Sequence, residues 1–188
     1  MTAESIHVEL RSVSGRPLAG EFADYAGPDI DQVQGDDAVE ILTAQEQSTL
    51  ALLAPLDEHG VRGLTYAPGK WTLKEVVGHL ADDERIFAYR ALCIARADSR
   101  PLPGFDEKGY VLAAGFARRT LEDLLREYRT VRRASIALFS GLTREAWLRR
   151  GNVNDYDASV RGLAFHIAGH ELHHLRLLKE KYLPLLSG

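Results

Sequence analysis

Four stretches of apolar residues at helical spacing constrain the fold of this chain more than any other feature of the sequence. They run from about residue 38 to 56, 72 to 97, 120 to 141 and 159 to 182. Nothing from Ala38 onward has the alternating pattern of a β-strand. Four amphipathic helices of similar length predict an all-α protein with a four-helix bundle.

Capping signals mark where these helices begin. Thr72 and Glu75 form a T-x-x-E capping box at the start of the second helix, and Ser159 is placed to cap the fourth. The link "DSRPLPGFDEKGYVLAAGF" joins the second and third helices. It is long for a connection between adjacent antiparallel helices, so it is expected to cross over the bundle, with a short helical piece near its end.

Residues 1–36 differ from the rest of the chain. "IHVEL" alternates apolar and polar residues and predicts a short strand, and "SGRPLAG" and "YAGPDIDQVQGDD" are rich in turn formers. We expect an irregular N-terminal arm at 1–36 that packs on a bundle domain at 37–188.

Charge and cysteine usage limit the possible partners. The net charge of −4 gives no reason to expect a nucleic acid or an anionic membrane surface as partner. No apolar run approaches the length of a membrane span, and the first residues do not form a secretory signal. Cys93 is the only cysteine, so a cytoplasmic location is expected. A metal site would rely mainly on His, Asp or Glu.

The fourth helix contains "GHELHHLRLL", with three histidines in five consecutive positions. With Leu163 as the origin of a helical wheel, His170 and His174 fall at about 340° and 20°, near the centre of the apolar stripe. His166 and His173 fall at about 300° and 280°, on its flank, and are more typical of supporting or surface residues. Two imidazoles one turn apart on a buried face are typical of a shared metal ion.

The same segment fits the pattern H-E-x-x-H, which is the zinc helix of many metalloproteases. Such a protease normally has a third ligand well downstream. Only "LRLLKEKYLPLLSG" follows His174, and its one acidic residue, Glu180, lies on the polar face of the same helix. A protease of this type is therefore disfavoured, and any further ligand must lie upstream.

The second helix offers upstream ligands in "VVGHLADDERIF". His79 and Asp83 share the edge of the buried face, one turn apart, and Asp82 and Glu84 fall on either side of them. Taken alone, His79 would be an ordinary histidine at the boundary of the core, and an acidic run is usually a solvated face.

The segments "YAPGKWTLKEVVGHLADDERIFAYRAL" and "HIAGHELHHLRLL", together with "PLPGFDEKGYV", resemble the DinB-like family, also called the DinB/YfiT-like metalloenzymes. The resemblance covers about residues 38–183. It implies a four-helix bundle in which a divalent metal ion is held by three histidines, one in the second helix and two at i,i+4 in the last. Carried over to this chain, the ligands are His79, His170 and His174.

The resemblance also suggests chemistry. Some relatives are transferases or isomerases that use a low-molecular-weight thiol such as bacillithiol or mycothiol. We therefore expect a small-molecule substrate, zinc or nickel as the metal ion, and thiol S-transferase chemistry ahead of hydrolysis or a purely structural metal site. Asp83 and Glu171 are the candidate catalytic residues, and an interhelical salt bridge is the alternative for each. Apolar surface remaining on the first helix or the arm is compatible with a homodimer.

Overall fold

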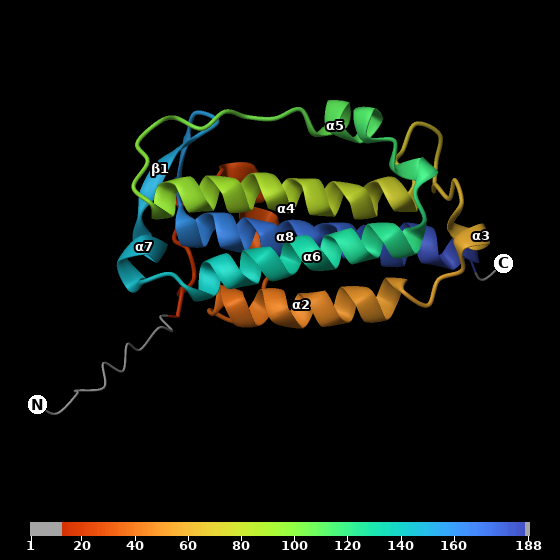
Figure 1. The fold of residues 1–188 in the computed structure, drawn as a ribbon, viewed down its shortest axis with the longest axis horizontal. Coiled ribbons are helices and arrows are strands. Elements are labelled where there is room, and N and C mark those ends of the chain that lie inside the picture. The colour runs from red at the N-terminus through yellow and green to blue at the C-terminus, as the bar shows by residue number, and fades with distance from the viewer. Residues whose placement is uncertain (1–12, 187–188) are drawn as a thin grey trace, which may run out of the picture.

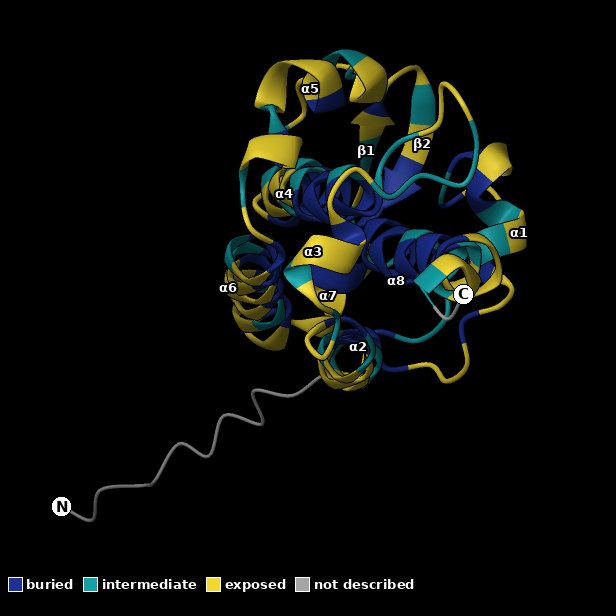
Figure 2. Ribbon diagram, turned by 90° about the vertical axis from the view of Figure 1, so that its right-hand side faces the viewer, coloured by how far each residue is buried: buried dark blue, intermediate teal, exposed yellow. Residues whose placement is uncertain are grey.

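The computed structural model describes residues 13–186, and four long helices dominate it (Figure 1). They are α2 (Ala38–Leu53), α4 (Leu73–Ala95), α6 (Leu121–Ser140) and α8 (Val160–Leu177). Their apolar faces meet in the interior and their polar faces point outward (Figure 2). The prediction of an all-α four-helix bundle is confirmed.

Shorter elements connect and extend the bundle. They are α1 (Gly27–Ile30), α3 (Glu58–Val61), α5 (Glu107–Ala114), α7 (Arg144–Leu148), 3-10 turns at Asp24–Ala26, Phe116–Arg118 and Leu183–Leu186, and a π-helical turn at Leu178–Tyr182. None of the described helices has the length and apolar content needed to cross a membrane.

The order of the helices in space follows from the long connection between α4 and α6. α4 packs against both α6 and α8, and α2 packs against the same two helices on the other side of the bundle. The connection at 96–120 runs back along the bundle and carries α5, so that α4 and α6 point in the same direction (Figure 1). The predicted crossover is therefore present.

The predicted caps form at the helix starts. Thr72 Oγ1 accepts a hydrogen bond from the backbone N–H of Glu75 at 3.2 Å, and the backbone N–H of Thr72 donates to Glu75 Oε2 at 2.7 Å. Ser159 Oγ accepts from the backbone N–H of Gly162 at 2.9 Å. Each cap satisfies a donor that the first helical turn leaves free.

The expectation that the chain contains no β-strand after Ala38 was wrong. Arg150–Val153 and Tyr156–Ser159 form strands β1 and β2, which pair in an antiparallel hairpin. Asn154 and Asp155 turn the chain with positive φ angles of 47° and 66°, the conformation of a tight hairpin turn. The predicted strand "IHVEL" lies outside the described residues.

The described part of the arm, residues 13–36, lies along α8. Two glycines of α8 permit this close approach. A Cβ at Gly169 would lie 2.8–2.9 Å from backbone atoms of Asp29 and Ile30, and one at Gly162 would lie 2.0 Å from Glu21 O. Glu21 also pairs with Arg161, whose Nε lies 2.6 Å from its Oε2. The start of the described chain is thereby placed beside the helix that carries most of the histidines.

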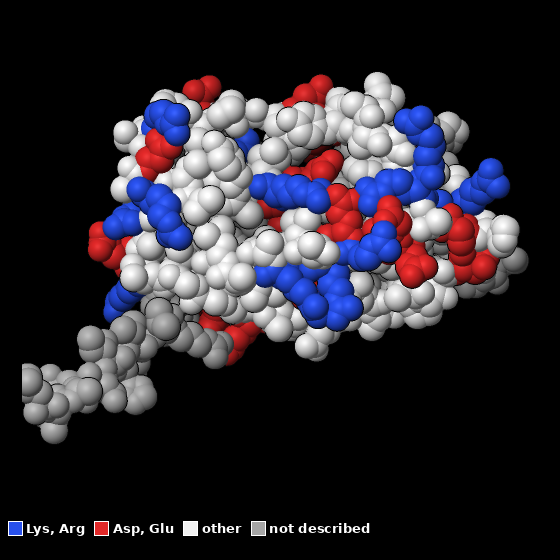
Figure 3. Space-filling model, viewed as in Figure 1, with Lys and Arg blue, Asp and Glu red and all other residues white. Residues whose placement is uncertain are grey.

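Charged residues of both signs gather on the face formed by α2, α4 and α6 (Figure 3). Glu46 of α2 accepts from Arg129 and Arg133 of α6, and Arg85 of α4 pairs with Glu127 of α6 at 2.6 Å. The mixture of signs links the helices and leaves no large patch of positive charge on this face.

Candidate metal centre

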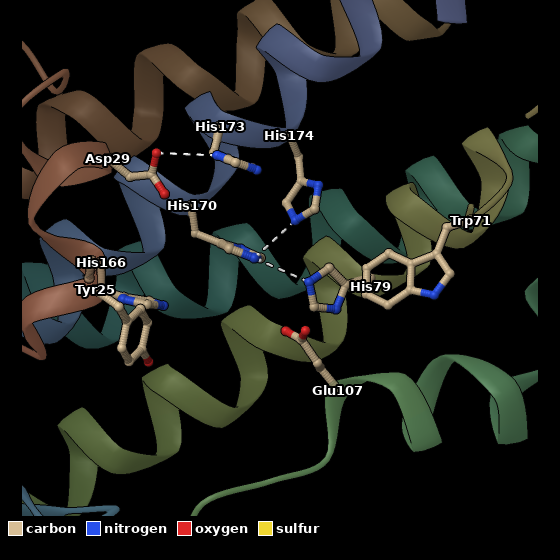
Figure 4. Close-up of a pocket in the computed structure, with 10 residues that line it drawn as sticks. Tyr25, Asp29, Trp71, His79, Glu107, His166, His170, His173 and His174 are labelled. Atoms are coloured by element: carbon tan, nitrogen blue, oxygen red, sulfur yellow. Dashed lines mark hydrogen bonds and ion pairs between the residues drawn. The ribbon is translucent and has the colours of Figure 1, made fainter. Parts of the chain in front are cut away.

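Three imidazoles from two helices converge in the middle of the bundle (Figure 4). His79 projects from α4, and His170 and His174 project from α8 one turn apart. The Nε2 atom of His170 lies 3.1 Å from the Nε2 atoms of both His79 and His174. Ligand atoms of all three lie within 4.8 Å of one another. The structure thus brings together the three histidines that the sequence singled out.

The chemistry of the cluster fits a divalent metal ion. Burial lowers the pKa of His79 to about 4 and that of His174 to about 3, and it lowers the pKa of His170 well below its ordinary value. All three rings are therefore neutral near neutral pH, as metal ligation requires. Two nitrogens bound tetrahedrally to zinc at about 2.0–2.1 Å are about 3.3 Å apart, close to the observed spacing.

Asp83 lies behind the cluster rather than inside it. Its Oδ2 atom is 3.2 Å from Nδ1 of His170, the ring nitrogen on the side away from the other imidazoles, although the pair lacks hydrogen-bond geometry. Burial raises the pKa of Asp83 to about 8, and the positive charge of Arg90 partly offsets this rise. An acid behind a histidine orients the ring and strengthens it as a ligand when the ring donates a hydrogen bond to it, and Asp83 is close enough to His170 for a small side-chain adjustment to form that bond.

Glu171, the other candidate catalytic residue, faces a different part of the bundle. Its Oε1 atom accepts hydrogen bonds from Thr49 and from the hydroxyl of Tyr128, and its Oε2 atom pairs with Arg132. Arg132 also pairs with Glu84 of α4 at 2.9 Å. Both carboxylate oxygens of Glu171 are thus engaged by α2 and α6. This is the interhelical salt bridge given above as the alternative, and it provides no support for a catalytic role.

The histidines on the flank of the stripe differ from each other in burial. His166 is only 8% exposed, and its ring stacks on Phe87 with the ring centroids 3.8 Å apart. The wheel placed His166 on the flank of the apolar stripe and His170 near its centre, yet the side chain of His166 is 9% exposed and that of His170 is 17% exposed. The side chain of His173 is 43% exposed and contacts Asp29, as expected for a supporting residue.

A cavity of about 260 Å³ opens directly onto the three imidazoles. Trp71 covers one side, with its ring centroid 4.7 Å from that of His79, and Glu107 of α5 faces the cluster from the crossover (Figure 4). Tyr25 of the arm lies at the opposite end. The sequence indicated neither Glu107, at the start of α5, nor Tyr25, in the 3-10 turn of the arm, because the path of the crossover and of the arm over the bundle could not be predicted. Trp71 directly precedes the Thr72 cap, which is the one signal that placed it near the start of α4.

Acid is expected to destabilise the metal-free protein as the pH falls below about 6.5. Burial lowers the pKa of His79 to about 4 and those of His166 and His174 to about 3. Between these values and about 6.5 the unfolded state binds more protons, so each histidine lowers the free energy of unfolding by about 1.4 kcal/mol per pH unit.

Asp83 opposes this trend, because its pKa is raised to about 8 and the folded state then holds the extra proton. Burial also raises the pKa values of Asp82 and Glu84, and it lowers that of His170. The four buried histidines outnumber the three carboxyls, so the net effect of falling pH is still a loss of stability. Urea unfolding of chelator-treated protein between about pH 7 and pH 4 measures it. A free energy of unfolding that stays constant across this range would contradict the prediction.

Comparisons with known proteins agree with the fold. The family model described as the DinB superfamily matches residues 41–178. The structure is similar to that of YfiT from Bacillus subtilis, with a TM-score of 0.64 and 18% sequence identity over 88% of this chain and 90% of that chain. YfiT is described as a probable metal-dependent hydrolase with an unusual four-helix bundle topology. No curated protein matches the sequence.

At this level of identity, the likeness to YfiT shows the fold alone. The family model is stronger evidence, because its match spans well over half of the sequence and includes His79, His170 and His174. The chain therefore belongs to the DinB superfamily.

Proposed function

We propose that this protein is a divalent-metal-dependent enzyme that transfers a low-molecular-weight thiol to an electrophilic small molecule. His79, His170 and His174 hold the metal ion in this proposal. The observation that carries it is a cluster of three neutral imidazoles that opens onto a cavity. Zinc and nickel both suit imidazole ligands, and the proposal does not depend on which of them is bound.

The ligand count supports catalysis over a structural role. Structural zinc sites are closed by four protein ligands, whereas catalytic sites leave a position open. Among the described residues, no Cys, Asp, Glu or further His joins the cluster. Asp83, the one candidate for a fourth ligand, contacts the far nitrogen of His170.

A divalent ion at this position supplies chemistry by lowering the pKa of a coordinated thiol or water, which yields a nucleophile near neutral pH. The residues of the chain prepare the site for it. Asp83 lies behind the ring of His170, and Trp71 limits access of water to one side of His79. Glu107 is exposed at the cavity wall, where it is available to take a proton from an incoming nucleophile.

The shape of the surroundings favours transfer between two substrates. The central cavity shares Trp71 and Glu107 with a larger one of about 520 Å³ on one side. On the other side it shares His166, His170 and Glu107 with a cavity of about 300 Å³. Only the smaller of these two cavities touches the imidazoles, and the larger one adjoins the central cavity at Trp71 and Glu107. In this proposal the two flanking cavities hold the thiol and the electrophile on either side of the metal ion. Hydrolysis, the second candidate, needs only one of these flanking cavities and is favoured by the description of YfiT.

Conjugation of a thiol to chlorodinitrobenzene tests the proposal. Sulfur displaces chloride to form a carbon–sulfur bond, and the thiol proton passes to the solvent. Cysteine, glutathione, bacillithiol and mycothiol are compared, because the pocket rather than the metal selects the thiol. We expect metal-dependent turnover with at least one of them, lost on chelation and in His174→Ala but retained in His173→Ala.

A thiol that binds at the site is also expected to shift the visible spectrum of cobalt-substituted protein. If no thiol shifts the spectrum and none is consumed faster than in metal-free protein, the transferase proposal fails. Metal-dependent cleavage of an activated ester without thiol would then establish hydrolysis instead.

A further inference from the structure

The cavity of about 300 Å³ beside the histidine cluster contains a buried cation that the metal site does not use. Arg90 of α4 lines this cavity and is only 4% exposed. It follows Asp83 by two helical turns, which is about 10.5 Å along the axis of α4. The same cavity reaches His166 and His170, which also line the cavity at the histidine cluster, so that Arg90 and the cluster face adjoining cavities.

The guanidinium of Arg90 has few partners. Nη2 donates a hydrogen bond to the carbonyl of Pro103 at 2.7 Å, and the group lies 4.7 Å from the ring centroid of Phe87 and 5.7 Å from that of Phe105. No carboxylate of the described chain lies within ion-pair distance of it. Arg132, which is buried to a similar degree, pairs with two carboxylates. A buried charge without a counterion is costly, and an anionic ligand would compensate that cost.

The two acidic residues of this cavity do not take the place of that ligand. Asp83 is directed at His170, 3.2 Å away, and serves the histidine cluster. Glu107 belongs to α5, is exposed to solvent and is therefore screened. The neutral side chains of Tyr156 and Asn154 also line this cavity. The described residues of this cavity thus leave the charge of Arg90 to be neutralised by a negatively charged ligand.

We propose that Arg90 binds the carboxylate of a small organic acid, and that this acid is the electrophilic substrate presented to the histidine cluster. The role of the acid as substrate rests on the proposed function, whereas the carboxylate site does not. The planar guanidinium fork matches a carboxylate through two parallel hydrogen bonds. Phe87, Phe105 and His166 surround the space between Arg90 and the cluster and suit a planar, unsaturated body.

Anchoring of the crossover loop is the simpler role for Arg90, and it accounts for only part of the arrangement. A peptide carbonyl such as that of Pro103 requires one neutral donor. It explains neither the positive charge nor the remaining guanidinium N–H groups, for which the described residues provide no acceptor. Ligand binding and stability can be measured separately, which distinguishes the two roles.

Benzoate and its neutral analogue benzamide are suitable probes, followed by NMR titration of the full-length protein. The metal-loaded wild-type protein is expected to bind benzoate at least about tenfold more tightly than benzamide, because hydrogen bonds to charged groups are the stronger ones. Arg90→Gln should reduce benzoate binding to the level of benzamide. Arg90→Lys should give an intermediate affinity, since it keeps the charge and loses the fork.

Arg85→Gln is the matched control. Arg85 also lies on α4, but it pairs with Asp82 and Glu127 on the outer face of the helix, so its loss should leave benzoate binding unchanged. Circular dichroism establishes that each variant is folded. Should Arg90→Gln fail to fold, Arg90→Lys and the comparison of benzoate with benzamide in the wild-type protein still decide the question.

The outcomes separate this proposal from the proposed function. Benzoate affinity that survives in folded Arg90→Gln, or that equals benzamide affinity in the wild-type protein, overturns the carboxylate site. The carboxylate site is also overturned if benzoate binding is lost on chelation but is unchanged in the Arg90 variants, because the carboxylate would then coordinate the metal directly. If benzoate binding depends on Arg90 but the protein does not bind a stoichiometric metal ion, the carboxylate site is supported and the proposed metal-dependent function is refuted.

Discussion

Replacing His170 with alanine is expected to abolish stoichiometric binding of a divalent metal ion. Its Nε2 atom is 3.1 Å from those of both His79 and His174, so this ring is the central member of the cluster. Removal of a residue that merely supports a ligand typically reduces metal affinity about 10–100-fold, and removal of the ligand itself should cost more. His174→Ala is expected to have the same effect.

Elemental analysis of the purified variants after dialysis against zinc or nickel measures the metal content. His173→Ala is the matched control, because His173 neighbours His174 on α8 and lines the same cavity, yet its Nδ1 atom contacts Asp29 instead of the cluster. We expect full occupancy in this variant. Full metal occupancy in folded His170→Ala would refute the assignment of the three ligands, and with it the proposed enzyme.

Helical spacing was sufficient to place two of these ligands, because His170 and His174 lie four residues apart and any helix brings them to one face. His79 was assigned through the resemblance to the DinB-like family, since its position at the edge of the buried face of α4 does not by itself indicate a ligand. The burial of His166 did not follow in the same way. α8 is contacted by α1, α2 and α4, so its buried arc is wider than the apolar stripe, and a flanking residue becomes enclosed.

Features that depend on irregular segments were not accessible from the sequence. Asp83 and Glu171 were both candidate catalytic residues, but the sequence did not indicate which neighbouring helix each would meet. Only Asp83 faces a ligand. The β1–β2 hairpin was missed because its two strands are short and are stabilised by a tertiary contact. The backbone N–H of Leu102, in the crossover, donates to the carbonyl of Asn152 at 3.0 Å. Arg90 acquires its role only because the same crossover covers it.

Arg132→Met is expected to destabilise the protein by about 3–5 kcal/mol, a large share of the stability of a typical domain. Arg132 of α6 is 1% exposed, and its Nε atom donates to both carboxylate oxygens of Glu84 at 2.9 and 3.0 Å. It also pairs with Glu171. Methionine fills a similar volume but leaves two buried carboxylates without a cation, which is the costly way to break such a network.

Urea unfolding of the variant and the wild-type protein measures this difference. Burial already raises the pKa of Glu84, and Arg132 acts against that rise. Without Arg132, the protonated form of Glu84 is favoured over the carboxylate. The difference in free energy of unfolding between variant and wild type should therefore shrink as the pH falls. The buried histidines affect both proteins alike and cancel in the comparison.

Arg129→Met is the control, because Arg129 lies on the same helix but is half exposed and pairs with Glu46 at the surface. Exposed pairs are worth about 0–1 kcal/mol, so a loss near that size is expected. A loss for Arg132→Met no larger than that of the control would show that the buried network does not hold the helices together.

The ion-pair network of Arg132, Glu84 and Glu171 lies beside the metal centre. Glu84 follows His79 on α4 by five residues, and Glu171 directly follows His170 on α8. Arg132 of α6 therefore ties together the two helices that supply the ligands, at the level of the cluster itself. Folded Arg132→Met protein should bind the metal ion more weakly than the wild type while retaining all three histidines. Unchanged metal affinity in that variant would mean that packing of α4 on α8 alone aligns the imidazoles.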